Sequence, residues 1–404
     1  MEIFTEGLNP AQKEAVETLA GPVLILAGAG SGKTKTLTHR IANLIAHGIP
    51  GDRMLAVTFT NKAAKEMRDR LWRLLQQARS DARLTPSFKD DVFADNAAML
   101  ATDGTPGRDI DSDGFTNPPR NFMPYMGTFH GICVRILRIE YQAAGLDRNF
   151  VIYDTDDQIS LVKQAMKDLK IDDKTLRPKS VQSTISHCKN TGQTPEEYEE
   201  EAYYPNQVKT AKIFARYEKL KRESFALDFD DLLLEVTKLF ENNKTIREKW
   251  QNRFEHILID EYQDTNVIQY KLIKMLSAVH KNVCVVGDDD QSIYRFQGVS
   301  ADNIQIFDKK YKPTKIVLEE NYRSSQAIID ASRQLISHNP REEKVLVAAG
   351  DNKNYDYQLP ILKSYSNAKD EMYGVLSEIE ELIQSGVSPQ EIGVIYGRNS
   401  YGEE

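Results

Sequence analysis

VLILAGAGSGKT, residues 23–34, is the stretch that decides the fold of this chain. A short apolar run, Val23 to Leu26, leads into a glycine-rich turn and then into helix-like sequence. This order is typical of the Walker A phosphate-binding loop, with Ala27 where the strict pattern has glycine. The stretch therefore predicts a buried strand, a phosphate-binding loop and a helix, in that order.

The residue types of this loop have a physical reason. Glycines at 28, 30 and 32 let backbone N–H groups curl around phosphate oxygens without a clashing Cβ, and the new helix adds its positive N-terminal end. Lys33 can reach the β- and γ-phosphates of ATP, and the Thr34 hydroxyl can bind Mg²⁺. The predicted ATP-binding loop comprises Ala27, Gly28, Ala29, Gly30, Ser31, Gly32, Lys33 and Thr34.

Two alternatives compete with this interpretation. One is an ordinary glycine-rich turn, which the complete order of strand, loop, GKT and helix disfavours. The other is a dinucleotide-binding fingerprint. After Gly28 and Gly30 it requires a third glycine at position 33, and Lys33 stands there.

Further short apolar runs alternate with longer amphipathic segments. This alternation indicates buried parallel strands joined by crossover helices, an α/β architecture with function at the carboxyl ends of the strands. The predicted strands, besides the first, are Leu55 to Thr58, Ile257 to Ile259, Val283 to Val286, Ile316 to Leu318 and Ile392 to Tyr396.

An acidic pair follows the predicted strand Ile257 to Ile259 in the segment ILIDEYQD, residues 257–264. Asp260 is suited to bind the metal, directly or through water, and Glu261 to orient and activate an attacking water. A solvated strand end is the alternative, but a Walker A lysine needs such a partner. We therefore expect Asp260 and Glu261 to face Lys33.

The next strand leads into VVGDDDQSIYRFQG, residues 285–298. Gln291 follows the strand end closely and can sense a γ-phosphate or position water. Three consecutive aspartates also suggest a metal nuclease, although a turn with self-capping Asp side chains is favoured.

Local signals place two other parts of the chain. Asn9 and Pro10 predict the cap and first position of a helix that ends before Gly21. Segments 156–169, 178–190 and 206–223 predict a small helical subdomain inserted into the α/β core. Residues 101–120 are rich in Gly, Pro, Asp and Asn and predict a loop.

Composition narrows the class of protein. The 404 residues are 40% hydrophobic and 28% charged, as in ordinary globular domains. No stretch approaches the roughly 20 apolar residues that span a membrane, and the N-terminus lacks a secretory pattern, so we expect a cytoplasmic protein. Three scattered cysteines support neither a zinc site nor disulfides. A net charge of −8 argues against nucleic-acid binding by overall charge, but not against a local groove.

Taken together, the motifs resemble those of superfamily 1A helicases of the UvrD/Rep/PcrA type, and they cover nearly the whole chain. The matching segments are LNPAQKEAV at 8–16, AGAGSGKT at 27–34, TFTNKAAKEMRDR at 58–70, GTFHGICVRILR at 127–138, DFDDLL at 228–233, DEYQDTN at 260–266, GDDDQSIYRFQG at 287–298 and LEENYRSSQAII at 318–329.

The resemblance implies roles that the residues alone do not. Gln12 occupies the place of a glutamine that reads the adenine edge, and Tyr322 that of a tyrosine that stacks on adenine. Arg323 matches an arginine that contacts the γ-phosphate from the second motor domain. Many relatives have an arginine after the Walker A threonine, whereas this chain has Lys35, which stacks less well.

The resemblance also implies contacts with DNA from three motifs. Aromatic rings stack on bases whatever their identity, so such binding tolerates any sequence. The core of the protein is the alternative location for the phenylalanines, and for Phe129 the two interpretations are balanced. The implied residues are Phe59, Asn61, Lys62, Thr128, Phe129, His130, Tyr294 and Phe296. Where this chain has Phe296-Gln297, relatives often have Trp-Arg.

Asp228, Asp230 and Asp231 are expected at a helix start, without a catalytic role.

The implied organisation has two RecA-like domains. Residues 1–126 and 224–313 would form domain 1A, with an insertion near 80–122 that looks longer than in relatives. Residues 127–223 would form helical subdomain 1B, and 314–404 the beginning of an incomplete domain 2A. Later family motifs, near TxHxxKGLE and VAxTRA, are absent from this sequence.

The resemblance thus implies an ATP-dependent helicase that hydrolyses ATP, with Mg²⁺ as cofactor, to translocate on single-stranded DNA in the 3′ to 5′ direction and unwind duplexes. Its partners would be single-stranded DNA and single-strand/duplex junctions, possible DNA repair or replication proteins, and no membrane, and it would be a monomer or weak dimer. DNA rather than RNA rests on the resemblance alone. Alternatives are an ATP- and DNA-binding fragment without motor activity, a subunit of a helicase–nuclease, and a small-molecule P-loop kinase.

Overall fold

A computed structural model describes residues 2–79, 117–119, 121–174, 176–292, 303–339, 341, 344–351 and 359–397. Its centre is a six-stranded sheet with the order β3-β2-β6-β7-β1-β8, in which every neighbouring pair is parallel. Its strands are β1 (Val23–Ala27), β2 (Met54–Val57), β3 (Met126–Gly127), β6 (His256–Ile259), β7 (Val283–Gly287) and β8 (Thr314–Leu318). The α/β class predicted from the sequence is confirmed.

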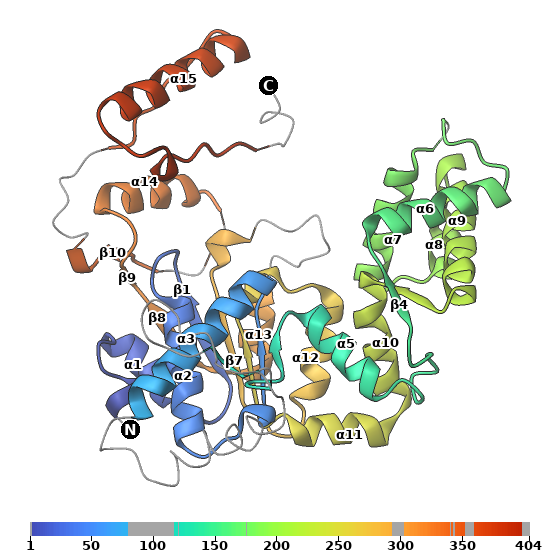
Figure 1. Cartoon of the computed structure of the whole chain (residues 1–404), viewed down its shortest axis with the longest axis horizontal. Coiled ribbons are helices and arrows are strands. Elements are labelled where there is room, and N and C mark those ends of the chain that lie inside the picture. Colours follow the sequence, from blue (N-terminus) through green and yellow to red (C-terminus); the bar gives the residue numbers. More distant parts are fainter. Residues whose placement is uncertain are drawn as a thin grey trace.

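Helices cover both faces of this sheet (Figure 1). Successive residues of a strand point to opposite faces, so a continuous apolar strand gives both faces an apolar surface that needs covering. In β1, Val23, Ile25 and Ala27 enter one hydrophobic core, whereas Leu24 and Leu26 enter the other. The first core is closed by α1 (Pro10–Glu17), α2 (Lys33–Ala46) and α3 (Asn61–Arg79), and the second by α5 (Phe129–Ile139), α10 (Phe229–Asn242), α11 (Lys244–Arg253), α12 (Val267–Leu276) and α13 (Asn303–Tyr311). Burial on both faces explains the continuous apolar runs of the strands.

The structure lacks one predicted strand, and its first sheet extends further along the chain than predicted. Residues 392–396 are described without any strand pairing, so the predicted strand there is wrong for this structure. Without a neighbour to take its backbone hydrogen bonds, an apolar run alone does not make a strand. The first sheet also extends beyond residue 313, because β8 pairs with β1 along its whole length, from Val23↔Thr314 to Ala27↔Leu318.

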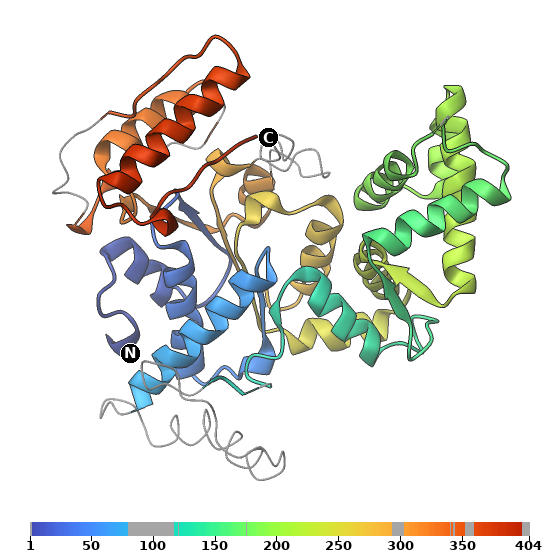
Figure 2. The same ribbon diagram turned by 45° about the horizontal axis from the view of Figure 1, so that its top comes forward.

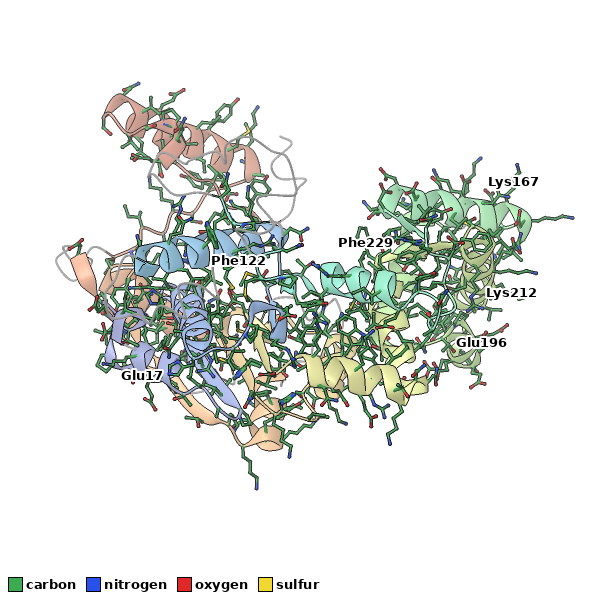
Figure 3. All side chains as sticks on the ribbon, turned by 60° about the horizontal axis from the view of Figure 1, so that its bottom comes forward. Glu17, Phe122, Lys167, Glu196, Lys212 and Phe229 are labelled. Carbon is green, nitrogen blue, oxygen red and sulfur yellow. The ribbon has the colours of Figure 1, made fainter. Side chains whose placement is uncertain are left out.

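A separate helical subdomain lies to one side of the sheet (Figures 1 and 2). It contains α6 (Thr155–Asp168), α7 (Pro178–Thr191), α8 (Pro195–Glu201) and α9 (Pro205–Glu223). Its own core includes Val162, Ile185 and Phe214, while Lys167, Glu196 and Lys212 lie on its exposed surface (Figure 3). The three helical segments predicted here are confirmed. Helix α5 instead packs in the main core, so the independent helical core begins after residue 139.

The remaining elements are short or lie towards the C-terminus. Strands β4 (Val151–Tyr153) and β5 (Ala226–Asp228) pair with each other, as do β9 (Glu320–Asn321) and β10 (Val347–Ala348). Helices α14 (Gln326–Ile336) and α15 (Ala368–Gln384) follow β8, and 3₁₀ turns occur at Glu2–Phe4, Gly51–Arg53, Tyr262–Asp264, Asp289–Gln291 and Pro389–Glu391. Among the described residues, no helix combines the length and apolarity needed to cross a membrane.

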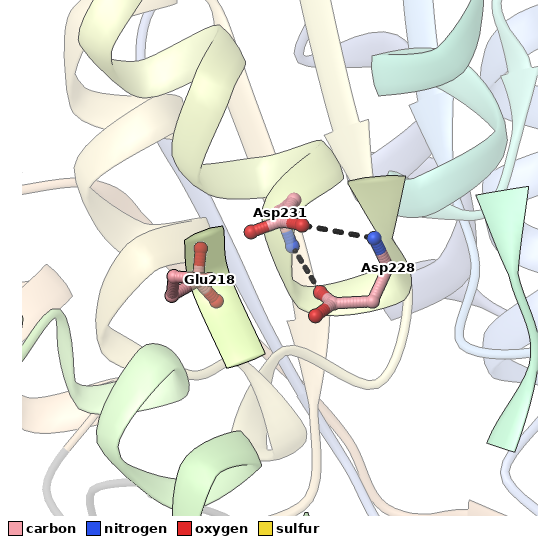
Figure 4. A group of neighbouring side chains, drawn as sticks. All are labelled: Glu218, Asp228 and Asp231. Carbon is pink, nitrogen blue, oxygen red and sulfur yellow. Dashed lines mark hydrogen bonds between the residues drawn. The ribbon is translucent and has the colours of Figure 1, made fainter. Parts of the chain in front are cut away.

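A buried charge cluster fastens the helical subdomain to the main core. Glu218 of α9 and Asp228 and Asp231 at the start of α10 lie close together (Figure 4). Asp228 caps α10 in a reciprocal capping box with Asp231, as expected for a helix start. Two buried ammonium groups neutralise the carboxylates: Lys189 of α7 lies 2.6 Å from Asp228, and Lys221 of α9 lies 2.6 Å from Asp231.

Lys189→Met should therefore destabilise the fold strongly. Removing one member of a buried ionic group leaves uncompensated buried charge, which costs about 3–5 kcal/mol. Urea unfolding would measure this cost. The matched control is Lys238→Met, because Lys238 pairs with Glu235 on the surface of α10 and surface changes stay within about 0.5 kcal/mol. Equal effects of the two substitutions would contradict the structural role of the cluster.

Candidate functional site

The glycine-rich loop leaves the carboxyl end of β1 and opens α2. Gly30 and Gly32 have φ angles of 75° and 82°, a left-handed conformation that favours glycine. Space is also restricted: a Cβ on Gly32 would lie 2.7 Å from Gln12 Nε2, and one on Gly30 would lie 2.6 Å from the Cβ of Arg323. The Ser31 hydroxyl donates to the Gly28 carbonyl at 2.8 Å. The side chains of Gln12 and Arg323 thus pack closely against the loop at these two glycines.

The acidic pair faces this loop, as predicted. Because β1 and β6 flank β7 in a parallel sheet, their carboxyl ends meet at one edge. Lys33 Nζ lies 3.1 Å from Glu261 Oε2, and Thr34 Oγ1 lies 3.5 Å from Asp260 Oδ2. Burial, together with the neighbouring Glu261 carboxylate, raises the pKa of Asp260 to about 6. A bound cation would stabilise the ionised form of this carboxyl group.

Residues after β8 dock directly on the loop. The Asn321 side chain donates to the Ala29 carbonyl at 2.6 Å, and the Tyr322 N–H donates to the Gly30 carbonyl at 2.9 Å. These bonds bring Arg323 to the same pocket as Lys33. The pocket has a volume of about 430 Å³ and is lined by Ala29, Gly30, Gly32, Lys33, Thr34, Lys35, Arg70, Glu261, Gln291, Tyr322 and Arg323.

The side chain of Gln12 is buried and hydrogen-bonds directly to the glycine-rich loop. Its Nε2 donates to the Ser31 carbonyl at 3.0 Å, and its Oε1 accepts from the Asn9 N–H at 3.2 Å. The Asn9 side chain in turn donates to the Tyr322 hydroxyl at 3.0 Å. The start of α1, the loop and Tyr322 therefore form one connected unit.

A second, neighbouring groove collects residues of the predicted DNA contacts. Phe59, Thr128, Phe129 and His130 line a groove of about 470 Å³ between the main body and α7. Phe129 is half-buried: it packs against the second core and also lines the groove. Burial lowers the pKa of His130.

Other predicted contact residues lie elsewhere. Asn61 lines a separate pocket beside Thr128 and Arg135, and Lys62 is exposed at the start of α3. Tyr294 and Phe296 lie outside the described residues, as does most of the 80–122 insertion.

The comparison with protein families decides the classification. The model of the UvrD/REP helicase N-terminal domain matches residues 8–312. This chain belongs to the UvrD/REP helicase family. The match spans the loop, the acidic pair, the groove and the helical subdomain, and so agrees with the geometry of the UvrD/REP site.

Curated relatives carry the similarity through the rest of the chain. An "ATP-dependent DNA helicase PcrA" of Staphylococcus aureus strain Mu50 is 36% identical over 403 residues, and one of Staphylococcus epidermidis strain RP62A is 37% identical over 405 residues. Each alignment covers 99% of this chain but 49% of the relative. The chain thus spans about half the length of the curated relatives it matches.

Membership of the UvrD/REP family implies ATP and a divalent metal, and the residues present fit both. A pocket lined by the glycine loop, with Lys33 at the start of the following helix, suits a triphosphate. A hydroxyl and a buried carboxylate, Thr34 and Asp260, are the hard oxygen ligands that a divalent cation prefers.

Sequence reasoning missed several residues of this UvrD/REP site. Gln263 donates to Glu261 Oε2 at 2.9 Å and accepts from the Asp288 N–H at 3.0 Å, so it joins the ends of β6 and β7. Asn321 anchors the docking segment, and Arg70 and Phe229 line the pocket and the groove. Figure 3 shows Phe229, the first residue of α10, between the main body and the helical subdomain. The EYQD and ENYRS contexts contained signals for Gln263 and Asn321.

Proposed function

We propose that this chain is the ATP-binding part of a DNA helicase motor that couples ATP hydrolysis to movement along single-stranded DNA, 3′ to 5′, and to duplex unwinding. One observation carries the proposal: Lys33, Glu261 and Arg323, from three distant parts of the sequence, line a single pocket beside the glycine loop. That convergence suits phosphoryl transfer, where catalysis is mainly positioning and charge stabilisation.

In the proposed reaction, the backbone N–H groups of the loop and Lys33 hold the phosphates of ATP. Lys33 now bonds Glu261, so phosphate oxygens would compete for its ammonium group and release the carboxylate. Glu261 then accepts a proton from water as the water oxygen attacks the γ-phosphorus. The bond from the γ-phosphorus to the bridging oxygen breaks, giving ADP and phosphate. Arg323 offsets the charge that develops.

Thr34 and Asp260 would hold Mg²⁺, which neutralises charge on the β- and γ-phosphates when bound. Gln12 and Tyr322 would recognise adenine, and Lys35 would lie beside them. Lys35 lines the same pocket, and its Nζ donates to the Gly7 carbonyl at 2.9 Å.

The DNA groove lies next to the catalytic residues, which supports coupling between them. A pocket of about 480 Å³ is lined by Phe59 and Thr58 on one side and by Asp260, Glu261 and Gln291 on the other. A base stacked on Phe59 would therefore adjoin Gln291, the proposed γ-phosphate sensor. We propose Phe59, Asn61, Lys62, Thr128, Phe129, His130, Tyr294 and Phe296 as DNA contacts.

Phe59→Ala should weaken binding of single-stranded DNA without changing ATP affinity. The Phe59 ring is 42% exposed at the groove, and loss of one stacking ring costs about 1–3 kcal/mol, or roughly 5- to 150-fold in affinity. Fluorescence anisotropy with oligo(dT) and a mixed sequence would measure this. The control is Tyr203→Ala, an aromatic side chain that is 89% exposed on the helical subdomain. Equal losses in both variants, or loss for one sequence only, would contradict sequence-tolerant stacking at Phe59.

The domain assignment is likewise a proposal. Residues 1–139 and 224–318 would form domain 1A, which then includes α5 and β8, residues 140–223 would form subdomain 1B, and the residues after 318 would begin domain 2A. The alternative candidate function is an ATP- and DNA-binding module without motor activity.

Turnover by the 404-residue chain tests the proposal. ATP hydrolysis is measured with and without single-stranded DNA, with Lys33→Ala as the blank. Turnover above the blank that rises with DNA supports a coupled motor site. Binding of ATP and DNA without turnover supports the binding module. Binding of neither ligand would refute both.

A further inference from the structure

Lys344 is a buried lysine to which neither the motifs nor the proposed reaction assigns a role. It is 2% exposed and lies between α14 and β10. Its ammonium group contacts the three consecutive aspartates after β7: it lies 2.5 Å from Asp288 Oδ1, 2.5 Å from Asp289 Oδ1 and 3.0 Å from Asp290 Oδ2. A segment some 55 residues further along the chain thus supplies the cation for this turn.

The contact has a clear electrostatic reason. The three carboxylates lie within 4.8 Å of one another, and like charges so close destabilise each other unless a cation lies between them. Burial alone would lower the pKa of Lys344, but the Asp288 carboxylate and hydrogen bonds to Asp288 and Asp289 raise it above its ordinary value. Arg341, 3.0 Å from Asp290, adds a second cation at the rim.

Asp288 connects Lys344 to the proposed catalytic residues. Its Oδ2 accepts from Gln291 Nε2 at 2.5 Å, so the sensor glutamine is held by the carboxylate that Lys344 neutralises. Its backbone N–H donates to Gln263, and Gln263 donates to Glu261. One continuous set of hydrogen bonds therefore runs from Lys344 to the proposed general base.

Lys344 is also tied to the segment that carries Arg323. Strand β10 pairs with β9, with Val347 opposite Glu320 and Ala348 opposite Asn321. Val345 N–H donates to Glu319 at 3.1 Å. Leu346 lies over the loop so closely that a Cβ on Gly28 would be 2.5 Å from its Cδ1. Lys344 and Arg323 consequently sit on one paired unit that touches the loop.

We propose that Lys344 is a positioning residue that links the Arg323 segment to Gln291 and Glu261 through the three-aspartate turn. Whenever that segment docks on the loop, the ammonium group orders Asp288 and, with it, the sensor and the base. When the segment withdraws, the turn loses its cation and the sensor loses its fixed partner. This inference rests on the proposed ATP hydrolysis and adds a second connection besides Arg323.

The kinetic test compares Lys344→Met with Lys344→Arg and with Lys315→Met, which removes a surface pair with Asp308. Coupling residues of this kind contribute about 3- to 30-fold. Lys344→Met should lower kcat about 3- to 30-fold relative to the wild-type chain. The KM for ATP should stay within about threefold of the wild-type value, because Lys344 does not line the nucleotide pocket. Ethylammonium added to Lys344→Met, or the arginine variant, should restore part of kcat. An unchanged kcat, or a loss without rescue by either, would overturn the proposal.

Hydrogen exchange provides a readout that does not need turnover. Lys344→Met should speed exchange by about 3- to 30-fold in both the 287–291 turn and the 319–323 segment, whereas Lys315→Met should leave them unchanged. Exchange unaltered in either segment would overturn the proposed link. If the wild-type chain hydrolyses no more ATP than Lys33→Ala, the proposed function fails, and the exchange result still decides whether Lys344 links the two segments.

Discussion

Arg323→Ala is expected to lower ATP turnover about 10³- to 10⁵-fold, the range for an arginine that stabilises the transition state of phosphoryl transfer. The side chain lines the pocket with Lys33 and Glu261, and its backbone N–H donates to the Asn321 side chain at 2.8 Å, which fixes the segment against the loop. Since negative charge spreads over the γ-phosphate oxygens only as the bond breaks, the loss should fall on kcat and leave ATP affinity within about tenfold.

Steady-state hydrolysis in saturating single-stranded DNA would measure kcat, and a fluorescent ATP analogue would measure affinity. Arg333→Ala is the matched control, because Arg333 is an exposed arginine on the following helix, α14. Arg323→Lys should recover only a small part of turnover, since a point charge cannot replace a planar fork of donors. Turnover of Arg323→Ala equal to that of Arg333→Ala would remove Arg323 from the catalytic assignment.

Glu261→Gln should lower turnover about 10²- to 10⁴-fold, the usual contribution of a general base. Glutamine has nearly the same shape, and its oxygen can still accept from Gln263, so the local structure should persist. ATP affinity should stay the same or rise, because Lys33 loses a competing carboxylate 3.1 Å away and becomes available for phosphate.

Single-turnover hydrolysis separates this chemical step from product release, and equilibrium binding of ATP provides the second measurement. Glu255→Gln is the control, because Glu255 pairs with Arg53 at the opposite, amino end of β6. Lost ATP binding in Glu261→Gln would mean that Glu261 holds the loop rather than activating water.

Predictions that depend on interactions between neighbouring residues were more accurate than predictions that depend on residues far apart in the sequence. Asn9 and Gln12 form a capping box, and Pro10 occupies the first helical position between them, so the start of α1 was predictable from neighbouring residues. The strand, loop and helix at 23–34 were predictable for the same reason. The apolar runs at 55–58, 257–259 and 283–286 formed strands because each is buried on both faces of the sheet.

Predictions that depended on pairing partners were less complete. The second domain was expected to begin at residue 314, yet β8 (Thr314–Leu318) pairs with β1 at the edge of the first sheet. Residues 392–396 have the same apolar character and no pairing among the described residues. Gln12 was expected on a nucleotide base; its Oε1 accepts within the local capping box, and only tertiary packing brings its Nε2 to the Ser31 carbonyl.

By itself, the sequence determined the phosphate loop, the acidic pair and the class of the fold, because each depends on residue types at short, fixed spacing. Arg323 was expected near the loop from the family resemblance. Only the tertiary structure decided that Lys344 reaches the turn after β7 and that Gln263 joins Asp288 to Glu261. The physical reason is that a parallel sheet gathers its strand ends at one edge, whatever the distance between those ends along the chain. A lone lysine near position 344 has no recognisable pattern until folding places three carboxylates around it.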